Sequence, residues 1–245
     1  MTFEQHARSF GSAVDAYEHG RPGYPAEVAD WMVPPAAGRL VDVGAGTGKF
    51  TRTLLGRGAE VVAVEPDPAM RSRLAALLPD VRALEGTGEA IPMPDGSVDA
   101  VTFAQSWHWV DPVAGITEAA RVLRPGGVLG LVWNVRDETS DWAQRLGDVI
   151  TRPGAQRMSY DDESMLDGPF GEREHRVFEW VHEQDRPAFL DMVLSRSYVI
   201  VLPDAERDGL RRAVEELLDT HPETAGRDVV RVPYRTHVHR YERRA

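Results

Sequence analysis

The sequence predicts an α/β fold, in which helices cover both faces of a mostly parallel β-sheet. Two observations support this prediction. Between residues 39 and 134, strand-like segments alternate with helical segments, and the strand-like segments are apolar along most of their length. Such strands are buried on both faces. Right-handed crossovers between them give a doubly wound sheet, whose ligands bind beyond the carboxyl ends of the strands.

The elements of this region are expected in a regular order. Asp67 is expected to cap the second helix, because a carboxylate at that position accepts hydrogen bonds from the first free N–H groups. Pro66 closes the second strand before it. The order is strand 39–44, helix 47–58, strand 60–66, helix 67–78, strand 81–86, strand 97–106, helix 112–123, turn 124–127 and strand 127–134.

The flanking regions are less regular. Short helical pieces are expected before residue 38, broken by RPGYP at 21–25. After residue 134 we expect two irregular helices within 138–170, a half-buried strand 175–184, helices 186–199 and 203–221, and a final strand 228–243. Pro233 favours an edge or a bulge for that strand, because proline cannot donate a ladder hydrogen bond. His237 and His239 are expected on one face of an exposed strand, in a structural role.

We expect one domain over residues 1–245, with N-terminal lid helices at 1–38, a ligand-binding core at 39–134, and a helical elaboration with the final strands at 135–245. The absence of cysteine excludes disulfides and thiolate chemistry, and no spacing of histidines and carboxylates predicts a metal site. The net charge of -11 disfavours nucleic acid as a partner. No signal peptide and no membrane-length apolar run is visible, so we expect a cytoplasmic protein.

The segment LVDVGAGTGKFT, residues 40–51, is a glycine-rich loop after a strand. It is a poor phosphate-binding loop, because Val43 replaces the first glycine of that motif and Phe50 replaces the magnesium-binding Ser or Thr. It fits the dinucleotide motif G-x-G-x-x-G better, but Lys49 stands at the third glycine. Glu65 follows Gly46 by 19 positions. A carboxylate there can accept both hydroxyls of an adenosyl ribose.

Four ordered segments carry a specific resemblance. They are VDVGAGTGKFT, VVAVEPDPAM, EGTGEAIPMPDGSVDAVTFAQSWHWVD and EAARVLRPGGVLGLVW. They resemble the motifs of the class I S-adenosylmethionine-dependent methyltransferases, type 11-like, and YEHGRPGYP with SWHW is similar to the trans-aconitate type of small-molecule enzymes. The resemblance implies a Rossmann-like, doubly wound, mostly parallel seven-stranded sheet with an antiparallel last strand and a helical cap. It also implies S-adenosylmethionine as the cofactor.

The resemblance assigns residues to the cofactor. Where relatives often carry Asp and Ala, this chain has Thr87 and Gly88, so adenine is expected to be held by backbone groups, apolar contacts and Glu89. Arg21 either pairs with the cofactor carboxylate or anchors a turn. Asp42 lies near the cofactor ammonium or an ordering amide. The cofactor contacts expected are Tyr17, Arg21, Asp42, Gly44, Ala45, Gly46, Thr47, Glu65, Pro66, Met70, Thr87, Gly88, Glu89 and Gln105.

The acceptor side is expected after the fourth and fifth strands. His108 is a candidate general base or a hydrogen-bonded structural histidine. The acceptor residues expected are Trp107, His108, Asn134, Arg136 and Trp142, with core, loop or helix-anchor roles as their alternatives, and Arg196 and Tyr198 are candidates for closing the pocket. The expected reaction is methylation of a small molecule at a carboxylate or hydroxyl oxygen, mainly by orientation.

Two other functions stay open on sequence grounds. The first is an adenosyl-ligand binding protein without catalysis. The second is an NAD-dependent oxidoreductase, although the single lysine, Lys49, lies inside the glycine loop and excludes a Tyr-x-x-x-Lys catalytic pair. We expect no membrane partner, and a homodimer is compatible with the sequence.

Overall fold

The computed structural model describes residues 21–150, 168–196, 199 and 201–245. The chain divides into two compact units. We call them the core unit, Gly23–Asn134, Ser159–Phe178 and Thr236–Ala245, and the second unit, Met1–Pro22, Val135–Met158 and Glu179–Arg235. No helix in the described part of the chain has both the length and the apolar character that crossing a bilayer requires.

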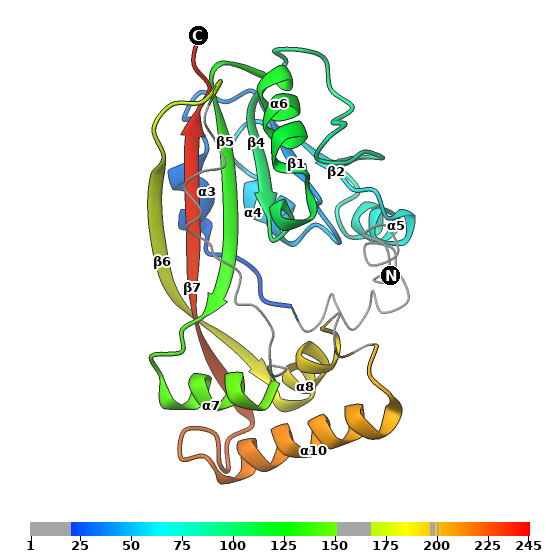
Figure 1. Ribbon diagram of the computed structural model, residues 1–245, viewed down its shortest axis with the longest axis vertical. Coiled ribbons are helices and arrows are strands. Elements are labelled where there is room, and N and C mark those ends of the chain that lie inside the picture. The colour runs from blue at the N-terminus through cyan, green and yellow to red at the C-terminus, as the bar shows by residue number, and fades with distance from the viewer. Residues whose placement is uncertain (1–20, 151–167, 197–198, 200) are drawn as a thin grey trace. The chain divides into compact units, whose positions relative to one another are not determined.

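Seven strands form one sheet, in the order β3-β2-β1-β4-β5-β7-β6. Neighbouring strands from β3 to β5 pair in parallel. Figure 1 shows β7 running opposite to β5 and β6. The strands are β1 Arg39–Val43, β2 Glu60–Val64, β3 Arg82–Leu84, β4 Val98–Ala104, β5 Leu123–Arg136, β6 Glu174–Asp185 and β7 Val229–Glu242. The predicted mostly parallel sheet with an antiparallel last strand is confirmed.

Helices cover both faces of the sheet in the core unit. Figure 1 shows α6 in front of the sheet and α3 behind it. Met32, Phe50 and Leu54 pack with strand residues into one buried apolar cluster. Asp67 caps α5 as predicted, because its Oδ1 accepts N–H hydrogen bonds from Ala69 at 2.8 Å and Met70 at 2.9 Å. The helices are α3 Ala26–Met32, α4 Lys49–Leu54, α5 Pro68–Leu77 and α6 Pro112–Val122.

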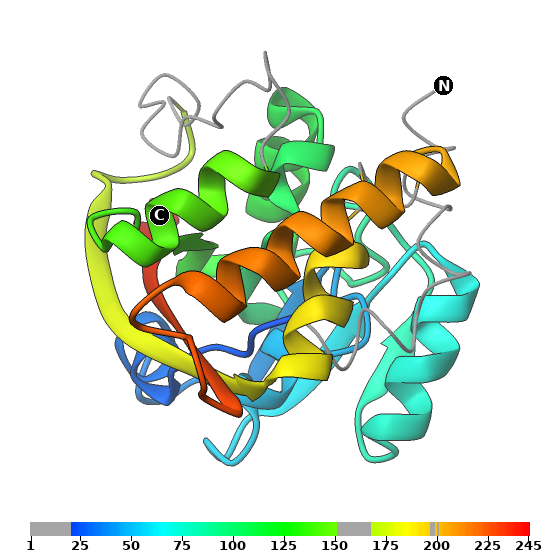
Figure 2. The ribbon, with the colours of Figure 1, turned by 90° about the horizontal axis from the view of Figure 1, so that it is seen from below.

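The second unit holds α7 Asp141–Ile150, α8 Arg186–Leu194 and α10 Asp204–Thr220. Figure 2 shows α7 and α10 lying side by side. Trp142, Leu146 and Phe189 are fully buried in its apolar core. The ring of His221 at the end of α10 reaches α7, with Nε2 2.9 Å from the Asp141 carboxylate.

The RPGG segment differs from its prediction as a turn. It lies within β5, which begins at Leu123. The reason is pairing with a distant strand: the Gly126 N–H donates to the Arg243 carbonyl at 2.9 Å, and the Arg243 N–H donates to the Gly127 carbonyl at 2.7 Å. The register between β4 and β5 shifts between Val98 and Ala100. Hydrogen bonds to a segment distant in the sequence therefore override the turn that glycine and proline predict here.

The last strand also differs from its prediction. Because β7 lies between β5 and β6, the predicted edge position for Pro233 is wrong. Proline still contributes an acceptor: its carbonyl accepts from the Asp137 N–H at 2.9 Å. The expected exposed histidine face is wrong too, because His239 is 1% exposed and His237 is half-buried. An inserted strand has neighbours on both sides, which the local alternation does not reveal.

Candidate functional site

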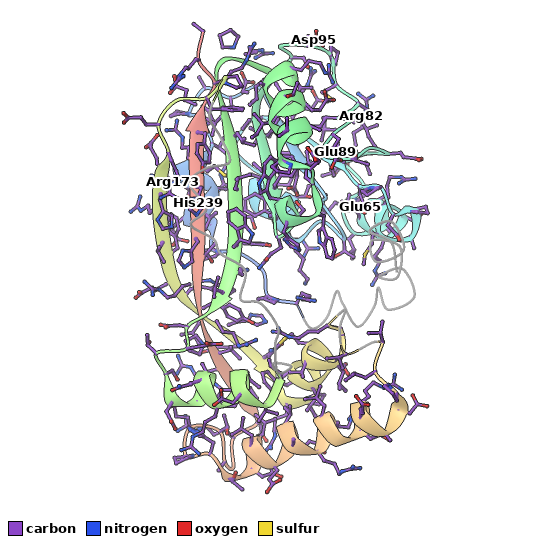
Figure 3. All side chains as sticks on the ribbon, viewed as in Figure 1. Glu65, Arg82, Glu89, Asp95, Arg173 and His239 are labelled. Carbon is purple, nitrogen blue, oxygen red and sulfur yellow. The ribbon has the colours of Figure 1, made fainter. Side chains whose placement is uncertain are left out.

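The carboxyl ends of β1, β2 and β4 lie at one edge of the sheet, because these strands are parallel neighbours. The glycine loop joins this edge directly. The N–H groups of Gly44 and Ala45 donate to the Val64 carbonyl at 2.8 and 3.1 Å. Glu65 follows at the end of β2, near the start of α5 (Figure 3). The structure thus brings the predicted loop and the predicted ribose ligand together.

Glu65 anchors the loop through both carboxylate oxygens. Oε2 accepts the Gly46 N–H at 2.8 Å, and Oε1 accepts the Asp67 N–H at 2.9 Å. Desolvation by burial raises the pKa of Glu65, and the two N–H donors oppose that rise. A carboxylate has about four lone-pair positions, so further hydroxyl donors fit on the same group. This arrangement fits an adenosyl ribose.

Asp42 lies beneath the loop, on β1, and is 1% exposed. Its oxygens accept hydroxyl hydrogen bonds from Thr51 at 2.6 Å and Thr102 at 3.0 Å. Desolvation by burial raises its pKa to about 6, and the threonine hydroxyls oppose the rise. The carboxylate therefore connects β1 to α4 and β4. The predicted contact of Asp42 with the cofactor ammonium or an ordering amide stays a prediction, and nothing in the sequence singled out the two threonines.

The glycines allow the loop to approach the end of β4 closely. Gly44 has φ 66°, and a Cβ there would lie 2.5 Å from the Cβ of Ser106. The Ser106 hydroxyl donates to the Val43 carbonyl at 2.7 Å. Gly46 also has positive φ, at 58°. A side chain at Gly44 would displace the β4 terminus or the loop, so glycine is required there.

The predicted adenine turn is closed by its own backbone. Thr87 and Ala90 form an antiparallel bridge. A Cβ at Gly88 would lie 2.5 Å from a Val110 methyl group. One oxygen of Glu89 accepts the Asp111 N–H at 2.8 Å, at the start of α6. Glu89 is thereby held at the turn, where Figure 3 labels it. Its contact with adenine stays a prediction.

The ends of β4 and β5 are joined by polar contacts that sequence reasoning missed. The Gln105 side chain donates through Nε2 to the Asn134 carbonyl at 2.8 Å. The Asn134 side chain donates through Nδ2 to the Gly23 carbonyl at 2.8 Å, and its Oδ1 accepts the Thr236 hydroxyl at 2.6 Å. Asn134 was predicted to contact the acceptor. In the structure, both the nitrogen and the oxygen of its side-chain amide hydrogen-bond to other segments of the core unit.

The SWHW segment contains the 3-10 helix η2, Trp107–Trp109. Trp107 is 4% exposed and lies edge-on to Phe103 with ring centroids 4.8 Å apart, so it takes the core role. His108 is exposed, and its ring centroid lies 4.8 Å from that of Trp109. Desolvation by the surrounding protein lowers the pKa of His108 to about 4. The imidazole is therefore neutral, and only weakly basic, at pH 7.

The remaining acceptor candidates lie in the second unit. Trp142 is 0% exposed, and its indole N–H donates to the Arg231 carbonyl at 3.0 Å. This agrees with the helix-anchor alternative and leaves no indole surface for an acceptor. The Arg136 guanidinium lies 3.6 Å from the Glu138 carboxylate. Arg196 contacts the Met192 sulfur at 3.9 Å.

The other predicted site residues either lie outside the described residues or are placed only by how buried they are. Tyr17 and Tyr198 lie outside the described residues. Arg21 is half-buried, and its pairing with the cofactor carboxylate stays a prediction. Of the other cofactor candidates, Thr47 and Met70 are buried, Ala45 is half-buried and Pro66 is exposed. Across the described ranges, no group of three or more histidine, aspartate or glutamate side chains is arranged to hold a metal ion.

Comparison with known proteins extends the likeness beyond the glycine loop. A family model described as a methyltransferase domain matches residues 41–131. The chain is 50% identical over 228 residues to an uncharacterized methyltransferase of Mycobacterium tuberculosis, and the match covers 93% of each chain. It is 31% identical over 238 residues to an uncharacterized methyltransferase-like protein of Schizosaccharomyces pombe, covering 94% of this chain and 93% of the other.

Solved structures give a similar result. A structure from Anaeromyxobacter dehalogenans, named provisionally as a type II methyltransferase, is 28% identical with a TM-score of 0.72. The match covers 90% of this chain and 97% of the other. The agreement therefore includes the second unit as well as the core unit.

Proposed function

The chain belongs to the class I S-adenosylmethionine-dependent methyltransferases, and from this premise we propose that it methylates an oxygen atom of a small molecule, with a carboxylate as the preferred acceptor. The cofactor supplies a methyl group on a sulfonium, which is already primed to leave as a neutral thioether. The protein must hold the two reactants in line and exclude water. Glu65 and the glycine loop perform the first part of that task by fixing the adenosyl group.

The observation that carries this proposal is the chemistry of the acceptor side. The segment 104–110, which follows β4 in the core unit, contains no carboxylate. An amine is protonated at pH 7 and must lose that proton before its nitrogen can attack, so an amine acceptor needs a carboxylate or another base beside it. A carboxylate or hydroxyl acceptor requires donors instead, and this segment supplies them as amide, indole and imidazole groups. The net charge of -11 supports a small molecule over nucleic acid.

The basicity of His108 favours the carboxylate over the hydroxyl. A general base works best when its pKa is near the operating pH. Desolvation lowers the pKa of His108, a direction that makes this imidazole a weaker acceptor for the proton of an alcohol. A carboxylate is already ionised at pH 7 and needs no base. His108 then acts by packing and by a neutral hydrogen bond to the acceptor.

The experiment is a matched acceptor series. Small molecules that share one carbon skeleton and carry a carboxylic acid, an alcohol or an amine are incubated with the protein and S-adenosylmethionine, and release of S-adenosylhomocysteine is measured. We expect turnover with acids, giving methyl esters. Turnover confined to amines would overturn the oxygen assignment.

The variant His108→Asn tests whether His108 acts as a general base. We expect a loss of less than about tenfold in kcat, since general acid–base catalysis contributes about 100-fold or more where it operates. A larger loss that disappears at high pH would show that His108 removes a proton, and would move the preferred acceptor to a hydroxyl.

A further inference from the structure

Gln105, directly after β4, has a backbone conformation that its side chain disfavours. Its φ is 56°, and among the described residues every other positive φ belongs to a glycine. A left-handed conformation is costly for a residue with a Cβ, and asparagine tolerates it better than glutamine does. Such a residue persists only where its surroundings hold it, and such residues cluster at functional sites.

Two hydrogen bonds hold Gln105 in this conformation. Its N–H donates to the Val132 carbonyl at 2.8 Å, and its side-chain Nε2 donates to the Asn134 carbonyl at 2.8 Å. Asn134 is itself held through Gly23 and Thr236. Both acceptors of Gln105 lie on β5, which is paired with β4. The β5 backbone therefore determines how β4 ends.

The backbone conformation of Gln105 determines where the next residue, Ser106, lies. Ser106 is 8% exposed, and its hydroxyl donates to the Val43 carbonyl at 2.7 Å. Its Cβ occupies the space beside Gly44, which is why a Cβ at Gly44 would be only 2.5 Å away. Rotation of the backbone at Gln105 would move Ser106 and remove this support from the first turn of the glycine loop.

We propose that Gln105 is a positioning residue, whose left-handed backbone, held by β5, places Ser106 against Gly44 and so keeps the glycine loop in its cofactor-binding shape. This role replaces the direct cofactor contact that the sequence suggested for Gln105. It rests on the proposed function only through the cofactor-binding role of that loop. Glycine adopts positive φ at no steric cost, so the proposal predicts an unusual order of substitutions at this position.

The experiment compares Gln105→Gly with Gln105→Ala. Both variants lose the side-chain hydrogen bond, but only glycine accepts φ 56° without strain. We expect the Kd for S-adenosylhomocysteine, measured by calorimetry, to rise about tenfold for Q105A and to stay within about threefold of the wild type for Q105G. Hydrogen exchange of the amides at 44–48 should be faster in Q105A and close to the wild type in Q105G.

A matched control uses Gln144, an exposed residue of α7. Inside a helix alanine is favoured over glycine, so stability should follow the opposite order there, with Kd for S-adenosylhomocysteine unchanged. If Q105A does not fold, Gln105→Asn takes its place. Asparagine tolerates positive φ, so we expect the Kd of Q105N to rise by less than tenfold and to lie close to that of Q105G.

Three results would overturn the proposal. A loss of tenfold or more in Q105G, equal to that in Q105A, would mean that the side chain acts by contact; where Q105N replaces Q105A, a loss of tenfold or more in Q105G would mean the same. Wild-type affinity in every Gln105 variant would mean that the conformation has no role. Unchanged exchange at 44–48 in Q105A would separate Gln105 from the loop. By contrast, a wild-type protein that does not bind S-adenosylhomocysteine at all would overturn the proposed function itself.

Discussion

In the core unit, the polar side chains of Asp42, Glu65 and Ser106 connect the strand ends to the glycine loop through hydrogen bonds of 2.6 to 3.0 Å. In the second unit, the interior is mainly apolar, with Trp142 and Leu146 fully buried. Directional contacts specify both a residue type and a spacing, whereas apolar packing accepts any side chain of suitable volume. The methyltransferase family model matches only residues 41–131, all within the core unit.

The largest effect is expected at Glu65. Glu65→Ala leaves the N–H groups of Gly46 and Asp67 without their carboxylate partner and removes the proposed ribose acceptor. We expect roughly a 1,000-fold increase in Kd for S-adenosylhomocysteine, or about 4 kcal/mol, because unsatisfied buried donors add to the lost ligand bonds. Calorimetric titration checks this. An affinity within tenfold of the wild type would contradict both roles of Glu65.

The variant Leu146→Ala tests whether packing in the second unit affects stability without affecting cofactor affinity. Leu146 is 0% exposed in the apolar core of the second unit, so its truncation should lower the free energy of unfolding by about 3 kcal/mol. Because no polar contact of the glycine loop is changed, the Kd for S-adenosylhomocysteine of the folded variant should stay within about twofold. Chemical denaturation and calorimetry measure the two quantities. A tenfold change in Kd would show that apolar packing of the second unit also sets cofactor affinity.

Asp42 makes stability depend on pH. Its pKa rises from 3.8 in the unfolded chain to about 6 in the fold, so the folded state binds the extra proton. The stabilisation is fully present below about pH 4 and is lost as pH rises through about 6, a change of up to about 3 kcal/mol. Asp42→Asn keeps partners for both threonines without the charge. We expect the variant's stability, relative to the wild type, to increase between pH 4 and 7.

His108 changes the stability with pH in the opposite direction to Asp42 over the same pH range. Its pKa is lowered to about 4, so the unfolded chain takes up a proton first and stability falls as pH decreases from about 6.5 to 4. His108 is unchanged in Asp42→Asn, so its contribution cancels when the two proteins are compared by urea denaturation at each pH. A difference that does not vary with pH would contradict the raised pKa of Asp42.

The smallest effect concerns two glycines with positive φ. A Cβ at Gly44 would meet Ser106 at 2.5 Å, whereas a Cβ at Gly56, with φ 79°, would meet nothing within 4 Å. Both alanine variants carry the backbone strain, but only Gly44→Ala carries the clash. We therefore expect Gly44→Ala to be less stable than Gly56→Ala by about 2 kcal/mol in thermal unfolding. Equal stability would mean that the β4 terminus moves aside at no cost.

The parts of the fold that the sequence predicted well are those with a local signal. The glycine loop, Glu65 and the Asp67 cap are defined by residue types at short spacings, and the structure places all three as expected. The doubly wound parallel sheet followed from alternating apolar segments, whereas its seven strands and antiparallel last strand were implied by the family resemblance. These features need no knowledge of distant contacts, because each strand and helix carries its own pattern.

The parts that were missed depend on distant partners. RPGG belongs to β5 because it pairs with residue 243, and Pro233 is interior because β6 pairs beyond it. The threonine partners of Asp42 lie 9 and 60 residues away. The conformation of Gln105 has no sequence signal, because glycine or asparagine would be the expected residue there. The position of Trp142 after the fifth strand left an acceptor contact and a helix anchor as alternatives, and its contacts with distant residues decide for the anchor.

We propose that the glycine loop and Glu65 form a site for an adenosyl group without phosphate. Calorimetric titration of the wild type and of Glu65→Ala with S-adenosylhomocysteine, S-adenosylmethionine and NAD tests this site. We expect micromolar binding of both sulfur compounds to the wild type, no binding of NAD, and loss of both ligands in the variant. Binding of NAD alone, or equal binding of the sulfur compounds to the two proteins, would contradict it.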